Sequence, residues 1–424
     1  MIFFIYNLFF PVVFVFFIPG IIIKQIRRSG WKSTFAERFA IFGKERTKEL
    51  QAYRGAVWIH SVSVGETQIA LDLIKKWKSI SPDKKFVLST TTTTGQQLAR
   101  DKINGMAAVI FCPIDFCLFV NKVFKLIQPS QLVILETELW PNMLYYARKR
   151  CKSVMLINGR MSDKSSRGYY RWRLFFRPVL KCFTRICVQS DNDMRRFLSV
   201  CPDAAVSVSG NLKFDRGVPE NLPEIDLKEY FGAGKFSIIL ASCTHAGEEK
   251  LVAETFMRLQ KEFADIRLVI VPRHAERAPG IAEELKALGL NFCRRTQGMD
   301  GKSQEVDCLL ADTTGEMFGF INKADIVIMG KSMAGHNEGH NLIEPALFAK
   351  AIVTGSVLTN FRFVLDILKN DKALICVSSD PELEEALRKL LSDPALCEQL
   401  GRAAEQAIAR HRGALEKTIN ILEA

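Results

Sequence analysis

The repeating pattern that decides the fold is first seen in residues 57–91, VWIHSVSVGETQIALDLIKKWKSISPDKKFVLSTT. An apolar, β-rich run at 57–62 passes through Gly65 into an amphipathic segment at 68–78, and a second apolar run follows at 86–91. Continuous apolar strands separated by helices are typical of a parallel sheet that is covered on both faces. The stretch therefore predicts an α/β fold.

The same alternation extends in both directions along the chain. Further strands are expected at 107–111, 132–135, 154–158, 185–188, 237–241, 267–271, 306–310, 326–329, 351–354 and 373–377. Residues 215–226, DRGVPENLPEID, are rich in proline and acids and read as a linker. We therefore expect two doubly wound, Rossmann-like domains, at 24–215 and 216–424, with ligands bound in a cleft at the carboxyl ends of their strands.

Residues 1–23, MIFFIYNLFFPVVFVFFIPGIII, carry no charge and are long enough to cross a bilayer. Lys24, Arg27 and Arg28 follow, which by the positive-inside rule places that flank in the cytoplasm. A cleaved signal peptide would need its charges before the apolar run. A kinked helix lying in the interface is the other alternative, because Pro11 and Pro19 interrupt the run. We expect an uncleaved N-terminal anchor, with the catalytic domains on the cytoplasmic side of a bacterial inner membrane.

Composition limits the class of protein. The 424 residues are 48% hydrophobic and 25% charged, which excludes disorder, collagen and a many-span transporter. The net charge of +12 favours an anionic partner, and no nucleic-acid-binding signature is present, so a membrane surface or phosphorylated substrate is preferred to nucleic acid. Eleven cysteines without a CxxC spacing indicate reduced thiols.

Polar residues that follow predicted strands are the candidates for chemistry in the first half. Glu66 comes directly after a strand and a glycine turn, where it suits a general base or a helix-capping carboxylate. Glu136 and Glu138 follow the 132–135 strand, where they suit catalysis, capping or packing alike. Lys213, in the turn that closes this half, suits a phosphate or carboxylate contact or an ordinary solvated lysine.

The second half offers cations and a glycine-rich loop. Arg273 ends a predicted strand, and the loop at 330–341 follows another and opens a helix near Asn341, where free backbone N–H groups bind phosphate. Glu344, one turn later, is placed to accept from ribose hydroxyls. His336 and His340 are four residues apart, but a loop lacks the rigid helix that such zinc spacing needs, so no metal site is expected.

Taken together, these segments resemble the 3-deoxy-D-manno-octulosonic acid (Kdo) transferases of lipopolysaccharide biosynthesis. The shared stretches are HSVSVGE (60–66), STTTTTG (89–95), ETELWPN (136–142), NGRMSDKS (158–165), GNLKFD (210–215), VPRHAER (271–277), DTTGE (312–316) and GHNLIEP (339–345). They occur in the family's order across nearly the whole chain. Two departures lie in the glycine-rich loop, where Lys331 and Glu338 stand at positions that are commonly glycine in the family.

The resemblance implies a GT-B glycosyltransferase fold, with an acceptor-binding domain at 24–215 and a CMP-sugar-binding domain at 216–424. It implies an inverting transfer of Kdo from CMP-Kdo to the tetra-acylated lipid A precursor, lipid IVA, without a metal or cofactor. The family's general base falls on Glu66, and its transition-state-stabilising residues fall on Glu136 and Lys213. The implied CMP contacts are Pro272, Arg273, Thr314, Gly315, Glu316, Asn341, Leu342, Ile343 and Glu344.

A basic, aromatic stretch at 167–181 is expected to face lipid or its headgroups, with Arg167, Arg171, Arg173, Arg177 and Lys181 as its cations. Two rival functions stay open. One is a GT-B transferase that uses another nucleotide sugar, such as a UDP-hexose. The other is an inactive, membrane-tethered nucleotide-binding scaffold. The sequence gives neither the number of Kdo residues transferred nor the oligomeric state.

Overall fold

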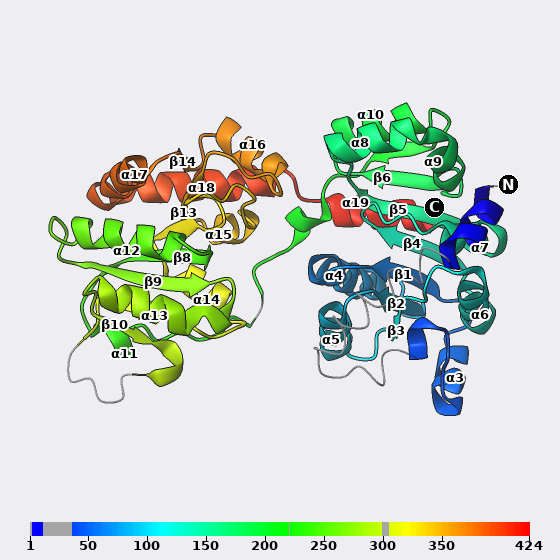
Figure 1. The fold of residues 1–424 in the computed structure, drawn as a ribbon, viewed down its shortest axis with the longest axis horizontal. Helices are drawn as coiled ribbons and strands as arrows, with labels where there is room; N and C mark the ends of the chain where they lie inside the picture. Colours follow the sequence, from blue (N-terminus) through cyan, green and yellow to red (C-terminus); the bar gives the residue numbers. More distant parts are fainter. Residues whose placement is uncertain (1, 12–35, 220, 299–304) are drawn as a thin grey trace. The chain divides into compact units, whose positions relative to one another are not determined.

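The computed structural model describes residues 2–11, 36–219, 221–298 and 305–424. The chain forms two compact units, a first unit of Met1–Arg216 with Arg412–Ala424 and a second unit of Gly217–His411. Each unit is built on a seven-stranded sheet, and helices pack against it (Figure 1). The two parallel-sheet α/β domains expected from the alternating pattern are therefore confirmed.

All strands of the first sheet run parallel, in the order β3-β2-β1-β4-β5-β6-β7. Their bounds are β1 Val57–Ser61, β2 Phe86–Thr90, β3 Ala108–Phe111, β4 Gln131–Leu135, β5 Ser153–Gly159, β6 Arg185–Val188 and β7 Val206–Val208. Side chains alternate between the two faces of a strand. Trp58 and Val87 accordingly belong to one apolar core, and Ile59 and Leu88 belong to the other. Both faces are covered, which explains why these strands are apolar without interruption.

The helices of the first unit connect these strands and cover both cores. They are α3 Lys44–Gln51, α4 Val64–Ile80, α5 Thr93–Lys102, α6 Cys117–Ile127, α7 Pro141–Arg150, α8 Asp163–Arg171, α9 Arg173–Leu180, α10 Asp191–Val200 and α19 Ala414–Glu423, with the 3₁₀ turn η1 at Leu212–Asp215. Parallel neighbours joined through helices bring every strand's carboxyl end to the same edge of the sheet.

The second sheet is also parallel, in the order β10-β11-β9-β8-β12-β13-β14. Its strands are β8 Ser237–Thr244, β9 Ile266–Pro272, β10 Phe292–Arg294, β11 Cys308–Leu310, β12 Ile326–Met329, β13 Ala351–Gly355 and β14 Ile375–Val377. Its helices are α11 Lys228–Phe231, α12 Glu248–Leu259, α13 Ala278–Ala287, α14 Met317–Lys323, α15 Ile343–Leu347, α16 Arg362–Asn370, α17 Asp380–Ser392 and α18 Pro394–Ala409.

The last segment of the chain corrects the predicted domain boundary. The sequence assigned everything from residue 216 onward to the second domain, whereas Arg412–Ala424 belongs to the first unit. Its helix α19 contributes Ile419 and Leu422 to the core that α4 also covers. The Asp215 carboxylate accepts a hydrogen bond from the backbone N–H of Leu415 at 2.7 Å. The C-terminal helix thus completes the first sheet's packing.

Residues 2–11 form a helix that packs on α6 and α7 in the first unit. The side-chain amides of Asn7 and Asn142 donate to each other at 2.7 and 3.0 Å, and the Tyr6 hydroxyl donates to Asp115 at 3.1 Å. The predicted membrane anchor at 1–23 otherwise lies outside the described residues. Within the described part of the chain, no helix is both long and apolar enough to cross a membrane.

Candidate active site

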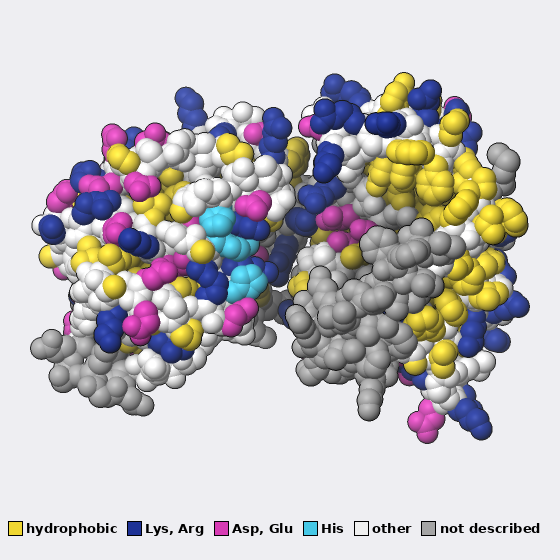
Figure 2. All heavy atoms as spheres, viewed as in Figure 1, with side chains coloured by type: hydrophobic (Ala, Val, Ile, Leu, Met, Phe, Trp, Pro, Cys, Tyr) yellow, Lys and Arg dark blue, Asp and Glu magenta, His cyan; other side chains and the backbone are white. Residues whose placement is uncertain are grey.

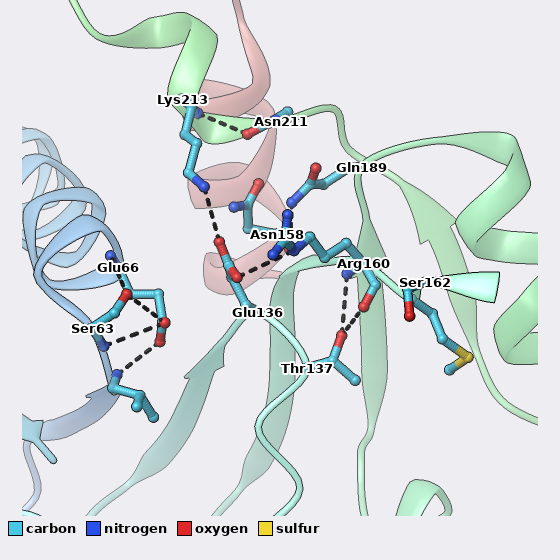
Figure 3. Close-up of polar contacts among 12 residues, drawn as sticks. Ser63, Glu66, Glu136, Thr137, Asn158, Arg160, Ser162, Gln189, Asn211 and Lys213 are labelled. Atoms are coloured by element: carbon cyan, nitrogen blue, oxygen red, sulfur yellow. Dashed lines mark hydrogen bonds and ion pairs between the residues drawn. The ribbon is translucent and has the colours of Figure 1, made fainter. Parts of the chain in front are cut away.

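The carboxyl edge of the first sheet gathers polar side chains from four neighbouring segments (Figure 3). Glu66 lies in the first turn of α4, directly after β1, and Glu136 is the first residue after β4. Asn158 is near the end of β5, and Lys213 projects from η1 toward Glu136. The three residues expected to carry catalysis, Glu66, Glu136 and Lys213, therefore all lie at this edge.

Glu66 is held by a capping box at the start of α4. Ser63 is the N-cap residue, and its hydroxyl accepts from the Glu66 backbone N–H. The Glu66 carboxylate in turn accepts from the backbone N–H of Val62 at 2.7 Å and from the Ser63 hydroxyl at 2.7 Å. The helix-capping role and a catalytic role are thus compatible, because the cap fixes where the carboxylate points.

Burial makes Glu66 a stronger base than an exposed glutamate. The residue is 7% exposed, and this desolvation raises the pKa of its carboxyl. Hydrogen bonds from Ser63 and Val62 oppose the shift, and the negative charge of Glu136 adds to it. A carboxylate with a raised pKa and fixed orientation suits proton abstraction from a hydroxyl group.

Glu136 is compensated by two cations. Its Oε1 lies 3.2 Å from Lys213 Nζ, and its Oε2 lies 3.5 Å from Arg160 Nε. Glu136 has a positive φ of 54°, a conformation that costs free energy for a residue with a side chain. The turn carrying Lys213 is fixed in its own right, because the side chain of Asn211 accepts from the Lys213 backbone N–H at 3.0 Å.

The positive φ of Glu136 also changes the interpretation of Glu138. Strand β4 ends at Leu135, so Glu136 and Glu138 lie in the turn that follows it and not in a continuing strand. The pKa of Glu138 is raised to about 7, first by burial and then by the charges of Glu66 and Glu136. The site thus holds three acidic side chains that influence one another. The sequence contained the signal, ETE, but not the turn that brings the two glutamates together.

In the second unit, the predicted donor contacts lie at the carboxyl ends of β9, β11 and β12. Pro272 is the last residue of β9, and Arg273 follows it with an exposed side chain. Thr314 and Gly315 are exposed in the turn before α14. The Glu316 carboxylate is bound by the Arg295 guanidinium through two contacts at 2.7 and 2.8 Å, which lowers the pKa of Glu316.

The segment Asn341 to Glu344 opens α15 and divides into exposed and buried parts. The side chains of Leu342 and Ile343 are buried, so only their backbone groups are available to a ligand. Asn341 donates to the Glu344 carboxylate at 3.2 Å and accepts from the Ile343 backbone N–H at 3.2 Å. These residues are positioned by their own local hydrogen bonds.

The glycine-rich loop after β12 differs from the expected phosphate cradle. Glu248, which is fully buried at the start of α12, accepts from the backbone N–H groups of Lys331, Ser332 and Met333 at 2.7, 2.9 and 3.0 Å. It also accepts from the backbone N–H of His245 at 2.8 Å. Because a carboxylate of the protein already occupies these donors, a bound anion would have to be held chiefly by side chains. No sequence motif indicated this role for Glu248.

His336 and His340, for which the sequence predicted no zinc site, both lie close to the segment that follows β8. His340 Nε2 lies 3.1 Å from His245 Nε2, and His336 Nε2 lies 3.1 Å from the carbonyl oxygen of Ala246. Among the described residues, no three or more histidine, cysteine or acidic side chains form a group that could hold a metal ion.

Comparison with known proteins places the chain in a family. Residues 33–216 match the family model described as 3-deoxy-D-manno-octulosonic-acid transferase (kdotransferase). A 3-deoxy-D-manno-octulosonic acid transferase of Rickettsia bellii is 30% identical over 419 residues, which cover 97% of this chain and 96% of that protein. The chain belongs to the Kdo transferase family. The resemblance expected from the motifs is therefore confirmed.

Two further comparisons agree with this membership. A 3-deoxy-D-manno-octulosonic acid transferase of Bordetella pertussis is 30% identical and covers 94% of both chains. A solved glycosyltransferase from Rickettsia africae has a TM-score of 0.58 at 13% identity, covering 87% of this chain and 98% of that one. That likeness concerns the fold alone, which in this Kdo transferase family member consists of two parallel-sheet α/β domains.

Proposed function

We propose that this chain is a CMP-Kdo-dependent glycosyltransferase that transfers Kdo to lipid IVA in lipopolysaccharide biosynthesis, with inversion at the anomeric carbon. The observation that supports this most directly is the Glu66 carboxylate, oriented by its capping box in an edge that also holds Glu136 and Lys213. Family membership limits the choice of donor and acceptor substrates, because the fold alone would not specify either substrate.

In the proposed reaction, Glu66 accepts the proton of an acceptor hydroxyl while that oxygen bonds to the anomeric carbon of Kdo. The bond between the anomeric carbon and the phosphate oxygen breaks, and its electron pair leaves with CMP. Attack and departure on opposite sides invert the anomeric configuration. A positioned base of this kind contributes about 10²–10⁴ in rate. Lys213 and Arg160 balance the Glu136 charge beside it.

The donor is proposed to bind in the second unit through Pro272, Arg273, Thr314, Gly315, Glu316 and residues 341–344. Arg273 is exposed and cationic, which suits a contact with the phosphate that becomes the leaving group. Transfer is proposed to need no metal, because side-chain cations would stabilise the negative charge that develops on the phosphate.

An inner-membrane location, with the units on the cytoplasmic side, is supported by the surface of the first unit. Its helix at 2–11 exposes Phe4, Leu8 and Phe9 by 73%, 60% and 59%. This helix contacts α9 through Tyr6 and Phe175, whose rings lie 6.4 Å apart. Figure 2 shows apolar side chains gathered on this unit with basic side chains around them.

The stretch predicted to face lipid belongs to the same surface. Trp172 and Leu174 are exposed by 65% and 85%. Its cations are Arg167, Arg171, Arg173, Arg177 and Lys181. Apolar area combined with basic residues suits an anionic membrane, at roughly 1 kcal/mol for each well-placed cation.

The deciding experiment is a mass spectrum of the lipid product. Membranes containing the full chain receive lipid IVA and CMP-Kdo supplied by a coupled synthetase, beside membranes with Glu66→Gln and with the exposed-site control Glu45→Gln. We expect Kdo-bearing lipid from the native and control chains and a large loss with Glu66→Gln. The number of increments gives the number of residues transferred.

Two outcomes would replace the proposal. Transfer from a UDP-hexose but not from CMP-Kdo would assign a different donor to the same scaffold. Binding of CMP-Kdo without transfer, unchanged by Glu66→Gln, would indicate the inactive nucleotide-binding scaffold.

A further inference from the structure

Four of the six histidines of the chain come together in the second unit. His245 follows β8, His274 follows β9, and His336 and His340 lie in the loop after β12. The ring centroids of His340, His336 and His274 lie 5.3, 5.5 and 6.0 Å from that of His245. Figure 2 shows histidine side chains gathered on one face of the second unit, with basic and acidic side chains beside them.

His245 and His340 form a close pair within this cluster. Their Nε2 atoms are 3.1 Å apart, and the rings are inclined by only 20°. Two imidazole nitrogens reach this distance when one carries a hydrogen and the other offers a lone pair. The pair can accept one additional proton at an Nδ1 atom and keep this hydrogen bond. A second additional proton would place hydrogens on both Nε2 atoms and break it.

Cations and carboxylates both lie around the pair, and most of the charges that act on its two pKa values are positive. The charged and titratable groups that face it are Arg273 and His274 after β9, Lys331, His336 and Glu338 in the loop, Glu248 on α12, Cys243 on β8 and Glu344 on α15. Glu248 is the nearest opposing carboxylate, and four backbone N–H groups already donate to it. Lys331 Nζ lies 3.7 Å from Glu338 Oε1, whereas Arg273, whose charge lowers the pKa of His340, is exposed to an incoming anion.

This environment keeps the pair uncharged. Burial lowers the pKa of both rings, and the neighbouring cations lower it further, to about 4 for His340. An anion bound beside the rings would act in the opposite direction, because a nearby negative charge favours the imidazolium form. Anion binding and proton uptake should thus be coupled at this position.

We propose that His245 and His340 form a proton-linked site for the phosphodiester group of the nucleotide-sugar donor, which takes up one proton when the donor binds. The proposal rests on the proposed function, because it places the donor's phosphate beside Arg273. When the bond to the anomeric carbon breaks, the phosphate gains a second negative charge. The protonated pair then faces this charge as a hydrogen-bond donor.

The experiment uses the full chain in detergent and isothermal titration calorimetry. The probe is cytidine 5′-(methyl phosphate), a phosphodiester whose single charge is constant between pH 6 and 8, and uncharged cytidine is the comparison ligand. Titrations at each pH in two buffers with different ionisation enthalpies give the number of protons taken up. The variants are His245→Gln, His340→Gln and the control His411→Gln, an exposed histidine after α18.

We expect the native chain and His411→Gln to take up as much as one proton with the probe and to bind it more tightly as the pH falls, by up to about tenfold per pH unit. His245→Gln and His340→Gln should lose the pH-linked gain, so that their affinity for the probe changes little between pH 8 and pH 6. Cytidine should cause no proton uptake. The native chain tests the linkage by itself if a variant fails to fold.

The possible failures are distinct. Absence of probe binding at any pH would refute both the CMP-sugar donor and this site. Binding without proton uptake would overturn the proton-linked site and leave the donor assignment standing. Proton uptake that persists in both variants, or that also occurs with cytidine, would show that the His245–His340 pair is not the group that takes up a proton when the phosphate binds.

Discussion

The Nζ atom of Lys213 lies 3.2 Å from Oε1 of Glu136, which joins the end of β4 to a turn 77 residues later in the chain. Arg160 approaches the other carboxylate oxygen at 3.5 Å. The two cations thus compensate a carboxylate whose side chain is only 14% exposed. Its charge in turn acts on the two other acidic groups, Glu66 and Glu138.

Replacing Glu136 by glutamine should move the acidic limb of the pH–rate profile. The Glu136 charge raises the pKa of Glu66 and Glu138, so its removal lowers both values. A base with a lower pKa stays ionised at more acidic pH. The acidic limb of kcat/KM should therefore shift to lower pH in Glu136→Gln. The measurement is the rate of Kdo transfer between pH 5 and 9, with Glu49→Gln on exposed α3 as the control. If the acidic limb did not move, the Glu136 charge would not influence the pKa of the base.

Glu66→Gln should reduce kcat by about 10²–10⁴ and leave the KM for the donor nearly unchanged. Glutamine can still accept from the Val62 backbone N–H and donate to the Ser63 hydroxyl, and it loses only the longer bond from the Ser63 backbone N–H at 3.3 Å. The free energy of unfolding should fall by no more than about 1 kcal/mol. Steady-state kinetics measures the change in kcat and KM, and urea unfolding measures the change in the free energy of unfolding. A variant that loses activity only in proportion to its folded fraction would give Glu66 a structural role alone.

The positions of most strands follow from the alternating sequence pattern, because burial on both faces demands continuous apolar runs. Strands β7 and β10 were not predicted. Each has only three residues and lies at a sheet edge, where partly exposed side chains do not form a continuous apolar run. The return of α19 to the first sheet could not be predicted. Its amphipathic pattern shows that one face is buried, but not which core receives that face.

The placement of the candidate site residues was predictable where a motif carries them. Glu66, Glu136 and Lys213 lie together as expected, because parallel strands bring their carboxyl ends to one edge. Glu248 was missed, since a glutamate at a helix start usually interacts with the helix itself. Its actual partners, the N–H groups of the loop after β12, depend on the spacing of two neighbouring strands. No local pattern contains that information.

Stability of the first unit should decrease as the pH falls from about 6.5 toward 4. His60 is fully buried, and desolvation lowers its pKa to about 4. Between these values the unfolded chain binds a proton that the folded chain does not, which favours unfolding. The loss from His60 should be about 2 kcal/mol at pH 5.

Tryptophan fluorescence isolates this effect, because all five tryptophans precede residue 216. Urea unfolding at pH 7.5 and pH 5 should show a smaller pH dependence in His60→Gln than in the native chain. His411→Gln should behave as the native chain does. An equal pH dependence in all three proteins would show that His60 is not the group responsible.

Glu248→Gln should weaken binding of the sugar donor more than binding of the lipid acceptor, because Glu248 holds the loop after β12 in the second unit. One glutamine oxygen can serve at most half of the donors, so about two of the four backbone N–H groups from His245, Lys331, Ser332 and Met333 would face an NH₂ group. Each buried donor left unsatisfied costs about 1–3 kcal/mol, so the second unit should lose roughly 2–6 kcal/mol. Because this loop also carries His340, the KM for CMP-Kdo should rise by more than the KM for lipid.

The matched control is Glu254→Gln on the same helix, where Glu254 forms an i,i+4 pair with Lys250 at 3.8 Å and its side chain is 40% exposed. A pair of this kind contributes less than about 1 kcal/mol, so this variant should keep both KM values. Thermal unfolding and two-substrate kinetics of the two variants compare the positions directly. If Glu248→Gln lost stability while both KM values stayed native, the Glu248 carboxylate would support the fold without positioning the donor loop.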